Sequence, residues 1–265
     1  MKRSKLLISI FLLINVGMTN ADCFIVVENN KVLKSQGNCE SRYSPCSTFK
    51  IAISLMAYEE RFLIDELNPV LKFKSGYLDD IDSWKQDHNP KTWMKHSCVW
   101  FSQLFTQSIG VDKFKEYLAK FSYGNQDVTG DAGKNNGLTN SWLSSSLEIS
   151  PSEQVKFLHK LINNKLPVSR KSHELTRNIL FIEDLPNGWK LYGKTGNGSL
   201  PNKDRTVQLD QQIGWFVGWV QKDERSIIFV KFIQDKNHQD TYASLRAKAI
   251  AKQNLLQIIS ALDLI

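Results

Sequence analysis

The sequence predicts a mixed α/β fold of the α+β type: one antiparallel sheet built from both chain ends and flanked by helices, with an inserted helical lobe. Two observations lead to this fold class. Strand-like segments occur at 23–35 and again at 189–235, whereas the chain between them reads as helices and loops. The 265 residues suffice for one large domain or two small lobes. We expect a single domain with these limits: 22–265 overall, a sheet lobe at about 22–46 and 188–265, and a helical lobe at about 47–187.

The first 21 residues differ in composition from the rest of the chain. Lys2, Arg3 and Lys5 precede the apolar run 6–14, and the small residue Ala21 closes the segment. This arrangement is typical of a secretory signal, and the run is too short to span a bilayer comfortably. We predict cleavage after Ala21 and Sec export to the periplasm, with no membrane attachment afterwards; a retained membrane anchor is the alternative.

Composition narrows the class of protein. Apolar residues make up 42% and charged residues 23% of the chain, which is ordinary for a soluble globular protein. Loss of the signal lowers the formal net charge from +7 to +4. The basic residues are scattered without aromatic residues between them, so nucleic-acid binding is not expected. A mildly basic surface fits solubility or the attraction of anionic small molecules.

The first strand-like segment, 23–35, has a turn signal at its centre in Asn29-Asn30. Cys23 and Cys39 bracket this hairpin, and we favour a disulfide between them because an exported protein meets an oxidising compartment. Free buried cysteines are the alternative for all four cysteines, Cys46 and Cys98 included. No cysteine or histidine spacing indicates a metal site, and we expect none.

The central part of the chain reads as helices joined by loops. Residues 47–61 form a helix that is apolar nearly all round and therefore buried. Residues 63–100 are loop-rich, with Asn89-Pro90 among the breakers. The remaining segments are short helical patterns around Gly110 at 99–121, a long polar loop at 122–137, and a helix at 151–164 opened by Ser150-Pro151 and Glu153.

The last part returns to strands, at 189–198, 213–222 and 226–235, and then to an amphipathic helix at 241–265. The boundary between a sheet lobe and a helical lobe is a natural place for a pocket.

One lysine lies where burial is expected. Ser47 and Lys50 are three residues apart on the buried helix and share one of its faces. Backbone N–H groups of the first turn stabilise an oxyanion, and a serine nucleophile needs an adjacent base. Burial lowers the pKa of a lysine, so Lys50 suits that base. A cap serine and a lysine reaching solvent are the alternative, because the Ser-x-x-Lys pattern alone is common.

Two further motifs accompany this pair. Lys194-Thr195-Gly196 lies on the first of the C-terminal strands. Ser97-Cys98-Val99 lies in the sequence between that motif and the Ser47–Lys50 pair. Ser-x-x-Lys, a serine triad and Lys-Thr-Gly together define the serine β-lactamase and penicillin-binding group. With Val99 in place of asparagine, Tyr123-Gly124-Asn125, and Trp142 in "WLSSSLEIS", the chain resembles the class D β-lactamases, the oxacillinases, over roughly residues 39–250.

The resemblance implies catalytic roles and a substrate class. It makes Ser47 the nucleophile that opens a β-lactam ring and becomes acylated. It makes Lys50 the general base, carboxylated to N6-carboxylysine by carbon dioxide or bicarbonate, with no other cofactor. Ser97 relays a proton to the ring nitrogen, supported by Lys194. The expected activity is penicillin hydrolysis that gives antibiotic resistance, on oxacillin-type substrates.

The resemblance also implies binding roles. Thr195 and Arg246 bind the substrate carboxylate, so replacing Arg246 is expected to weaken substrate capture more than replacing Lys248. The full set of implied binding positions is Thr195, Gly196, Asn197 and Arg246 for substrate, with backbone N–H groups of Ser47 and Asn197 as oxyanion hole, and Val99 and Trp142 around the carbamate.

Several of these positions have plainer interpretations. Trp142 fits a core equally well, Tyr123-Gly124-Asn125 fits a turn, and Arg246 fits a solvated helix face. Glu148 is not the deacylation base of class A enzymes, because their Glu-x-x-Leu-Asn signature is absent. Deacylation then lacks a carboxylate unless Lys50 provides one. We assign no role to Cys46 or Cys98.

Two other functions share this fold and these motifs. A β-lactam sensor acylates and then holds the drug, and a peptidoglycan peptidase uses the same serine on D-Ala-D-Ala. The sensors carry several membrane spans, and Val99 argues against the peptidase. The sequence leaves open which carbapenems or cephalosporins are hydrolysed, and whether the chain is a monomer or a weak homodimer.

Overall fold

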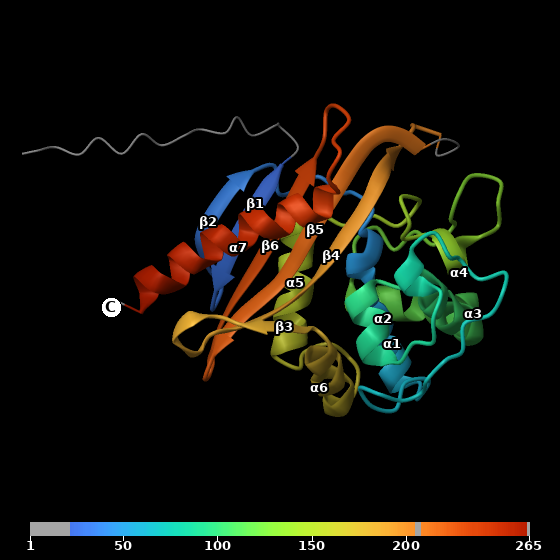
Figure 1. Cartoon of the computed structure of the whole chain (residues 1–265), viewed down its shortest axis with the longest axis horizontal. Helices are drawn as coiled ribbons and strands as arrows, with labels where there is room; N and C mark the ends of the chain where they lie inside the picture. The colour runs from blue at the N-terminus through green and yellow to red at the C-terminus, as the bar shows by residue number, and fades with distance from the viewer. Residues whose placement is uncertain (1–21, 205–207, 264–265) are drawn as a thin grey trace, which may run out of the picture.

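The computed structural model describes residues 22–204 and 208–263 (Figure 1). The expected signal segment, residues 1–21, lies outside the described residues. No helix in the described part of the chain combines the length and the apolarity that crossing a bilayer requires.

A six-stranded antiparallel sheet forms one half of the molecule. Its strand order is β2-β1-β6-β5-β4-β3, so the first strand of the chain pairs with the last. The strands are β1 Cys23–Glu28, β2 Lys31–Gly37, β3 Phe181–Asp184, β4 Lys190–Pro201, β5 Gln208–Lys222 and β6 Arg225–Gln234. This arrangement confirms the mixed fold with a sheet built from both chain ends.

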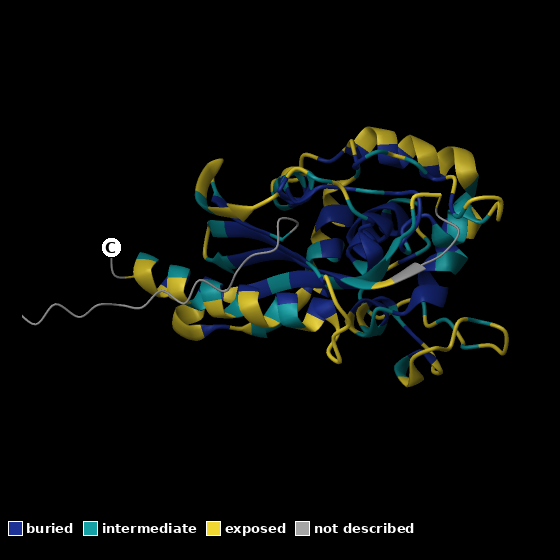
Figure 2. Ribbon diagram, turned by 90° about the horizontal axis from the view of Figure 1, so that it is seen from above, coloured by how far each residue is buried: buried dark blue, intermediate teal, exposed yellow. Residues whose placement is uncertain are grey.

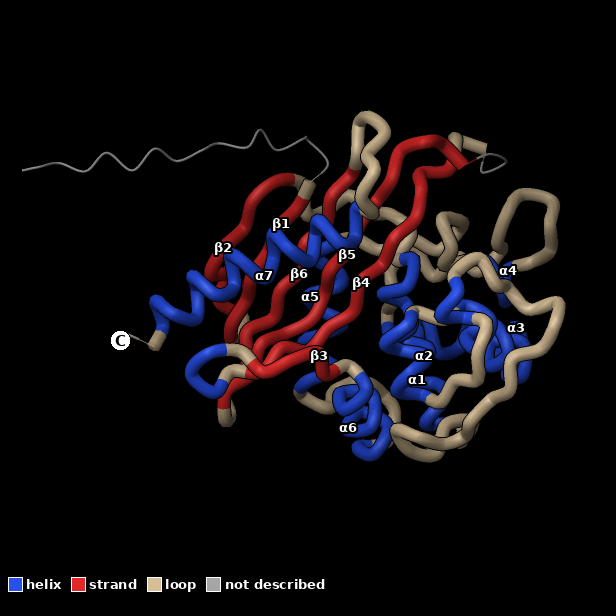
Figure 3. The backbone as a smooth tube through the Cα atoms, viewed as in Figure 1, coloured by secondary structure: helices blue, strands red, loops and turns tan. Residues whose placement is uncertain are grey.

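Two helices cover opposite faces of the sheet, α7 (Ala243–Leu262) in front and α5 (Pro151–Ile162) behind (Figures 1 and 3). Side chains alternate between the faces, as the pleat of a strand requires. On β5, Phe216 belongs to the apolar cluster under α7, whereas Trp215 belongs to the cluster on the other side. Both faces are therefore buried, which explains the nearly continuous apolar runs of β5 and β6.

The remaining helices lie beside the β4 edge (Figure 1). The central helix α1 is buried along almost its whole length, as its apolar circumference predicted (Figure 2). These elements are η1 Cys46–Phe49, α1 Lys50–Glu59, η2 Asp82–Trp84, α2 Pro90–His96, α3 Val99–Phe121, α4 Gly137–Asn140 and α6 Arg170–Ile179. A further short helix, η3 Pro186–Gly188, lies in the turn between β3 and β4, next to the C-terminal end of α7.

The structure differs from the sequence pattern at α2. Asn89-Pro90 reads as a breaker, yet it starts a helix. The Asn89 side chain accepts from the Thr92 N–H, the Thr92 hydroxyl accepts from the Asn89 N–H, and Pro90 occupies the first helical position. This reciprocal cap satisfies donors that a helix start leaves unpaired. Helix α6 and strand β3 lie in a stretch to which no helix or strand was assigned from the sequence.

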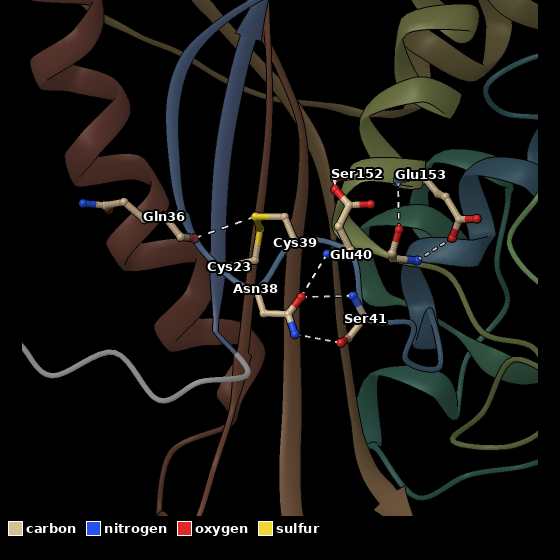
Figure 4. Close-up of a disulfide and its surroundings, with 9 residues drawn as sticks. Cys23, Gln36, Asn38, Cys39, Glu40, Ser41, Ser152 and Glu153 are labelled. Carbon is tan, nitrogen blue, oxygen red and sulfur yellow. Dashed lines mark hydrogen bonds between the residues drawn. A yellow bond between two sulfur atoms is a disulfide. The ribbon is translucent and has the colours of Figure 1, made fainter.

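The favoured disulfide is present. Cys23 and Cys39 are bonded, with 5.1 Å between their Cα atoms (Figure 4). Next to the bridge, the Asn38 side-chain oxygen accepts hydrogen bonds from the N–H groups of Glu40 and Ser41. The disulfide therefore ties the start of β1 to the segment that leads from the sheet into the helices. Cys46 and Cys98 are free thiols and are buried.

Candidate active site

The segment before Ser47 is anchored by Ser44. Its hydroxyl donates to the Trp142 carbonyl at 2.8 Å and accepts from the Ser144 N–H at 2.9 Å, and its carbonyl accepts from the Trp215 indole at 2.9 Å. The loop at 142–144 and strand β5 of the sheet thus hold the turn that leads from Ser44 to Ser47. No periodicity in the sequence marks Ser44 or Ser144 for this function.

Ser47 lies in η1 directly before α1. Cys46, the residue ahead of it, is buried with φ 49°, a left-handed conformation that costs a non-glycine residue energy. Such strain persists only where the surroundings hold it, and it occurs often at functional sites. The Thr48 hydroxyl donates to the Pro45 carbonyl and accepts from Gln154 of α5.

Lys50 lies one turn on, as the spacing predicted. Its Nζ donates to the Ser47 Oγ at 3.2 Å, and its side chain is completely buried. Burial lowers the pKa of Lys50 to about 8, while the adjacent thiols of Cys98 and Cys46 act weakly in the opposite direction. An amine with this pKa is partly neutral near neutral pH, which a proton acceptor requires.

Ser97 and Lys194 form a second serine–lysine pair, brought together from α2 and β4. The Lys194 Nζ donates to the Ser97 Oγ, and also to the Thr195 carbonyl at 3.0 Å. Ser97 ends α2 in a left-handed conformation, φ 56°. Burial lowers the pKa of Lys194 well below its usual value, and the charges of Lys50 and Lys248 lower it further.

Strand β4 lies directly against the turn that carries Ser47. A Cβ added at Gly196 would come within 2.8 Å of the Pro45 carbonyl and 3.1 Å of the Thr48 N–H nitrogen. Contacts this close admit only glycine without a shift of backbone. The Lys-Thr-Gly motif therefore brings the strand close enough for Lys194 to reach Ser97.

Trp142 is fully buried, and its indole N–H has no hydrogen-bond partner among the described residues. Its ring packs against Phe49, the neighbour of Lys50, with 5.6 Å between centroids. A buried donor left unpaired is costly, and such a group calls for an explanation. Val99 is buried at the start of α3.

Tyr123-Gly124-Asn125 joins two loops. The Asn125 side chain donates to the Ser146 carbonyl and accepts from the N–H groups of Asp127 and Glu148. Gly124 has φ 53°, and a Cβ there would collide with the Glu148 carbonyl. These contacts, together with the burial of Tyr123, support a structural role for the motif.

Arg246 stays a predicted carboxylate ligand; in the structure its guanidinium pairs with Asp235 at the end of β6 and donates to the Thr241 carbonyl. Asp235 is 7% exposed. The Asn197 side chain instead accepts from the Ser244 N–H at 3.0 Å. The structure thus brings Ser47, Lys50, Ser97, Lys194 and Gly196 together, and Arg246 is paired with Asp235.

Lys248 was not selected as a site residue. It lines a cavity together with Lys194 and Thr195. Among the residues described, no group of three or more His, Cys, Asp or Glu side chains is placed to hold a metal ion.

Comparison with known proteins agrees with this site. The penicillin-binding protein transpeptidase domain matches residues 21–256. Beta-lactamase OXA-1 of Escherichia coli is 40% identical over 91% of this chain and 85% of its own length. Beta-lactamase OXA-9 of Klebsiella pneumoniae is 38% identical over 85% of this chain and 84% of its own length.

Solved structures give the same result. The OXA-427 class D β-lactamase has a TM-score of 0.86 and 43% identity, covering 91% of this chain and 99% of its own. The C-terminal domain of the Bacillus licheniformis BlaR penicillin-receptor has a TM-score of 0.75 and 27% identity, covering 88% of each chain.

The fold and the paired serine–lysine site thus define a protein of the penicillin-binding transpeptidase class. Within that class the chain belongs to the class D β-lactamase family, whose members are β-lactam hydrolases. The resemblance inferred from the sequence motifs is confirmed.

Proposed function

We propose that the protein hydrolyses penicillins through an acyl-enzyme on Ser47, with carboxylated Lys50 as general base. The observation that carries this proposal is the completely buried Lys50 amine, 3.2 Å from the Ser47 Oγ and with its pKa lowered to about 8. Its consequence would be resistance to these antibiotics. Residues 22–265 would form one catalytic domain that combines the sheet and the helices.

The pocket around Lys50 suits a carbamate. A neutral amine is needed to combine with carbon dioxide, and burial supplies one. A buried carbamate needs hydrogen-bond donors, and the buried Trp142 indole N–H has no partner among the residues that the structure describes. Val99, buried and apolar, would keep water away. When present, the carbamate supplies the carboxylate base that the chain otherwise lacks.

In acylation, the Ser47 Oγ loses its proton to the base at Lys50 and attacks the ring carbonyl. Backbone N–H groups of Ser47 and Asn197 are the proposed donors to the resulting oxyanion. Opening the ring requires a proton at its nitrogen. Ser97 would donate that proton and recover one from Lys194, whose amine it already contacts.

Substrate binding would draw on the strand beside the nucleophile. Thr195 and Gly196 lie in β4 between Lys194 and Asn197, so the strand presents one continuous edge to the ligand. Export to the periplasm after removal of residues 1–21 is part of the proposal. The Cys23–Cys39 disulfide supports export, since such bridges persist in oxidising compartments.

The test is turnover of excess benzylpenicillin by the purified protein, with mass spectrometry of the acyl adduct. Many turnovers are expected from the parent, and none from Ser47→Ala. One stable adduct per chain would instead indicate a penicillin receptor, as the name of the BlaR domain describes. Substantial hydrolysis by a correctly folded Ser47→Ala protein would refute the nucleophile assignment.

A further inference from the structure

Ser144 connects two parts of the site that are far apart in the sequence. Its backbone N–H donates to the Ser44 Oγ at 2.9 Å, in the turn that leads to Ser47. Its own Oγ accepts from the Ser199 N–H at 3.0 Å, on β4 two residues beyond Asn197. Ser44 and Ser144 are both buried, and a hydrogen bond away from water is electrostatically stronger than one in solvent.

The bond to Ser199 shows which way the N–H groups of β4 face. Along an antiparallel strand, residues that bond to the neighbouring strand alternate with residues that do not. The Ser199 N–H goes to Ser144, and the Gly193 N–H goes to the Leu180 carbonyl at 2.9 Å, so neither points to β5. The pairing of β4 with β5 is regular from 190 to 199. The Asn197 N–H therefore lies on the same outer edge, turned out of the sheet as an oxyanion donor must be.

The space between the strand and the turn is filled. A Cβ added at Gly198 would collide with the Ser144 Oγ and the Cys46 Sγ. Ser44 is fixed from the sheet as well, because the Trp215 indole donates to its carbonyl at 2.9 Å. Packing thus keeps the strand and the turn from moving closer, and the two hydrogen bonds of Ser144 keep them from moving apart.

We propose that Ser144 is a positioning residue for the oxyanion hole, and that it sets the separation between the backbone N–H groups of Ser47 and Asn197. This inference rests on the proposed function and deepens it. Both donors must lie about 2.7–3.1 Å from one oxygen, so a small shift of β4 away from the turn weakens the site. Ser144 itself touches neither substrate nor the reacting atoms.

The test removes the Ser144 hydroxyl in two ways. Ser144→Ala keeps the Cβ, whereas Ser144→Gly also suits the left-handed backbone at this position, where φ is 54°. With benzylpenicillin at saturating bicarbonate, both variants should lower kcat by roughly tenfold and change KM less. The effect is smaller than the loss of a whole oxyanion donor, about 10²–10³ in kcat, because the donor is displaced and not deleted.

Phenylboronic acid gives a second measurement that reports on the oxyanion hole. The Ser47 Oγ bonds to boron and its proton passes to the base at Lys50. No group leaves, and boron becomes tetrahedral and negatively charged, with an oxygen available to the two N–H donors. The inhibition constant should rise in both Ser144 variants by about the same factor as kcat falls, since both quantities depend on the same pair of donors.

Ser146→Ala is the matched control, because it deletes another buried hydroxyl from the same loop. The Ser146 Oγ accepts from the Gly130 N–H at 2.9 Å and donates to the Asp127 carbonyl at 3.0 Å. Its partners belong to the loop before α4 and not to β4. This variant should lower the urea midpoint about as much as Ser144→Ala does, while kcat and the inhibition constant stay at the parent values.

Parent values of kcat and of the inhibition constant in both Ser144 variants would overturn the inference, and so would equal losses in Ser146→Ala. A fall in kcat that disappears as bicarbonate is raised would also overturn it, because the hydroxyl would then act through Lys50. The proposed function fails separately. A parent that keeps one stable penicillin adduct is no hydrolase, yet the boronic acid comparison still decides whether Ser144 positions the oxyanion hole.

Discussion

The buried Trp142 indole N–H has no hydrogen-bond partner in the part of the chain that the structure describes, and it gives a direct residue-level test of the site. Removing its N–H should make Lys50 carboxylation weaker, because the carbamate would lose a donor that is otherwise unused. Trp142→Phe is expected to need roughly tenfold more bicarbonate for half-maximal activity. The measurement is a bicarbonate titration of benzylpenicillin turnover.

Phe49→Leu is the control for Trp142→Phe, since Phe49 packs against the same ring and has no polar atom. That variant should shift stability but not the bicarbonate requirement. If the parent and Trp142→Phe need the same bicarbonate concentration for half-maximal activity, the indole N–H does not stabilise a carbamate and Trp142 is only a core side chain.

The lowered pKa of Lys50 predicts a particular pH dependence. Below a pKa of about 8 the amine is mostly protonated and cannot combine with carbon dioxide; above it the neutral form predominates. Recovery of activity by protein depleted of carbon dioxide should therefore speed up as pH rises toward 8, and level off beyond about 9. The measurement is the recovery rate at constant dissolved carbon dioxide.

An ordinary lysine would behave differently in this experiment. Its pKa of about 10.4 would let the recovery rate climb about tenfold for each unit up to pH 10. A curve of that form would contradict the burial of Lys50 in solution.

At the scale of elements, two helices allow a controlled comparison. Helices α2 and α5 begin with the same reciprocal cap and a proline, at Asn89 and Ser150 respectively. Only α2 ends at a site residue, Ser97. Asn89→Ala and Ser150→Ala should each lower the free energy of unfolding by about 1 kcal/mol.

Activity should separate these two variants. Asn89→Ala loosens the helix that positions Ser97, and we expect it to lower kcat several-fold. Ser150→Ala, at similar stability, should leave kcat close to that of the parent. The measurements are urea unfolding and steady-state kinetics, and equal kcat values would show that α2 needs no cap to position Ser97.

Prediction from sequence succeeded for elements whose signal is local. The Ser47–Lys50 spacing and the apolar circumference of α1 need no knowledge of the rest of the fold. Helix α6 was missed although it is amphipathic, because three of its four buried residues, Ser172, His173 and Thr176, are polar and only Ile179 is apolar. The ion pair between Arg246 and Asp235 was also not predicted, since it depends on how α7 is rotated against the sheet.

At the scale of the whole molecule, the disulfide joins the first strand to the entry of the helical part. It closes a loop across a sequence separation of 16 residues, for which about 3 kcal/mol of stabilisation is expected. The double variant Cys23→Ala, Cys39→Ala should unfold at lower urea concentration while retaining kcat when folded. The bridge stabilises the fold and touches none of the four serine and lysine residues of the site.

Reduction supplies the control for this prediction. Dithiothreitol should lower the urea midpoint of the parent to that of the double variant, and should leave the variant unchanged. A parent that is insensitive to reduction would contradict a structural role for the bridge.

The pairing of β1 with β6 has a consequence for the order of events during biosynthesis. Ser47, Lys50 and Ser97 emerge from the ribosome long before β4 to β6, which complete the sheet. Such distant pairing is slow, because loop closure precedes the contacts that reward it. Before those strands fold, Lys50 is expected to be hydrated and therefore protonated. If Lys50 is carboxylated as proposed, this reaction would start only when the chain has finished folding, so a newly made molecule would spend an interval intact but inactive.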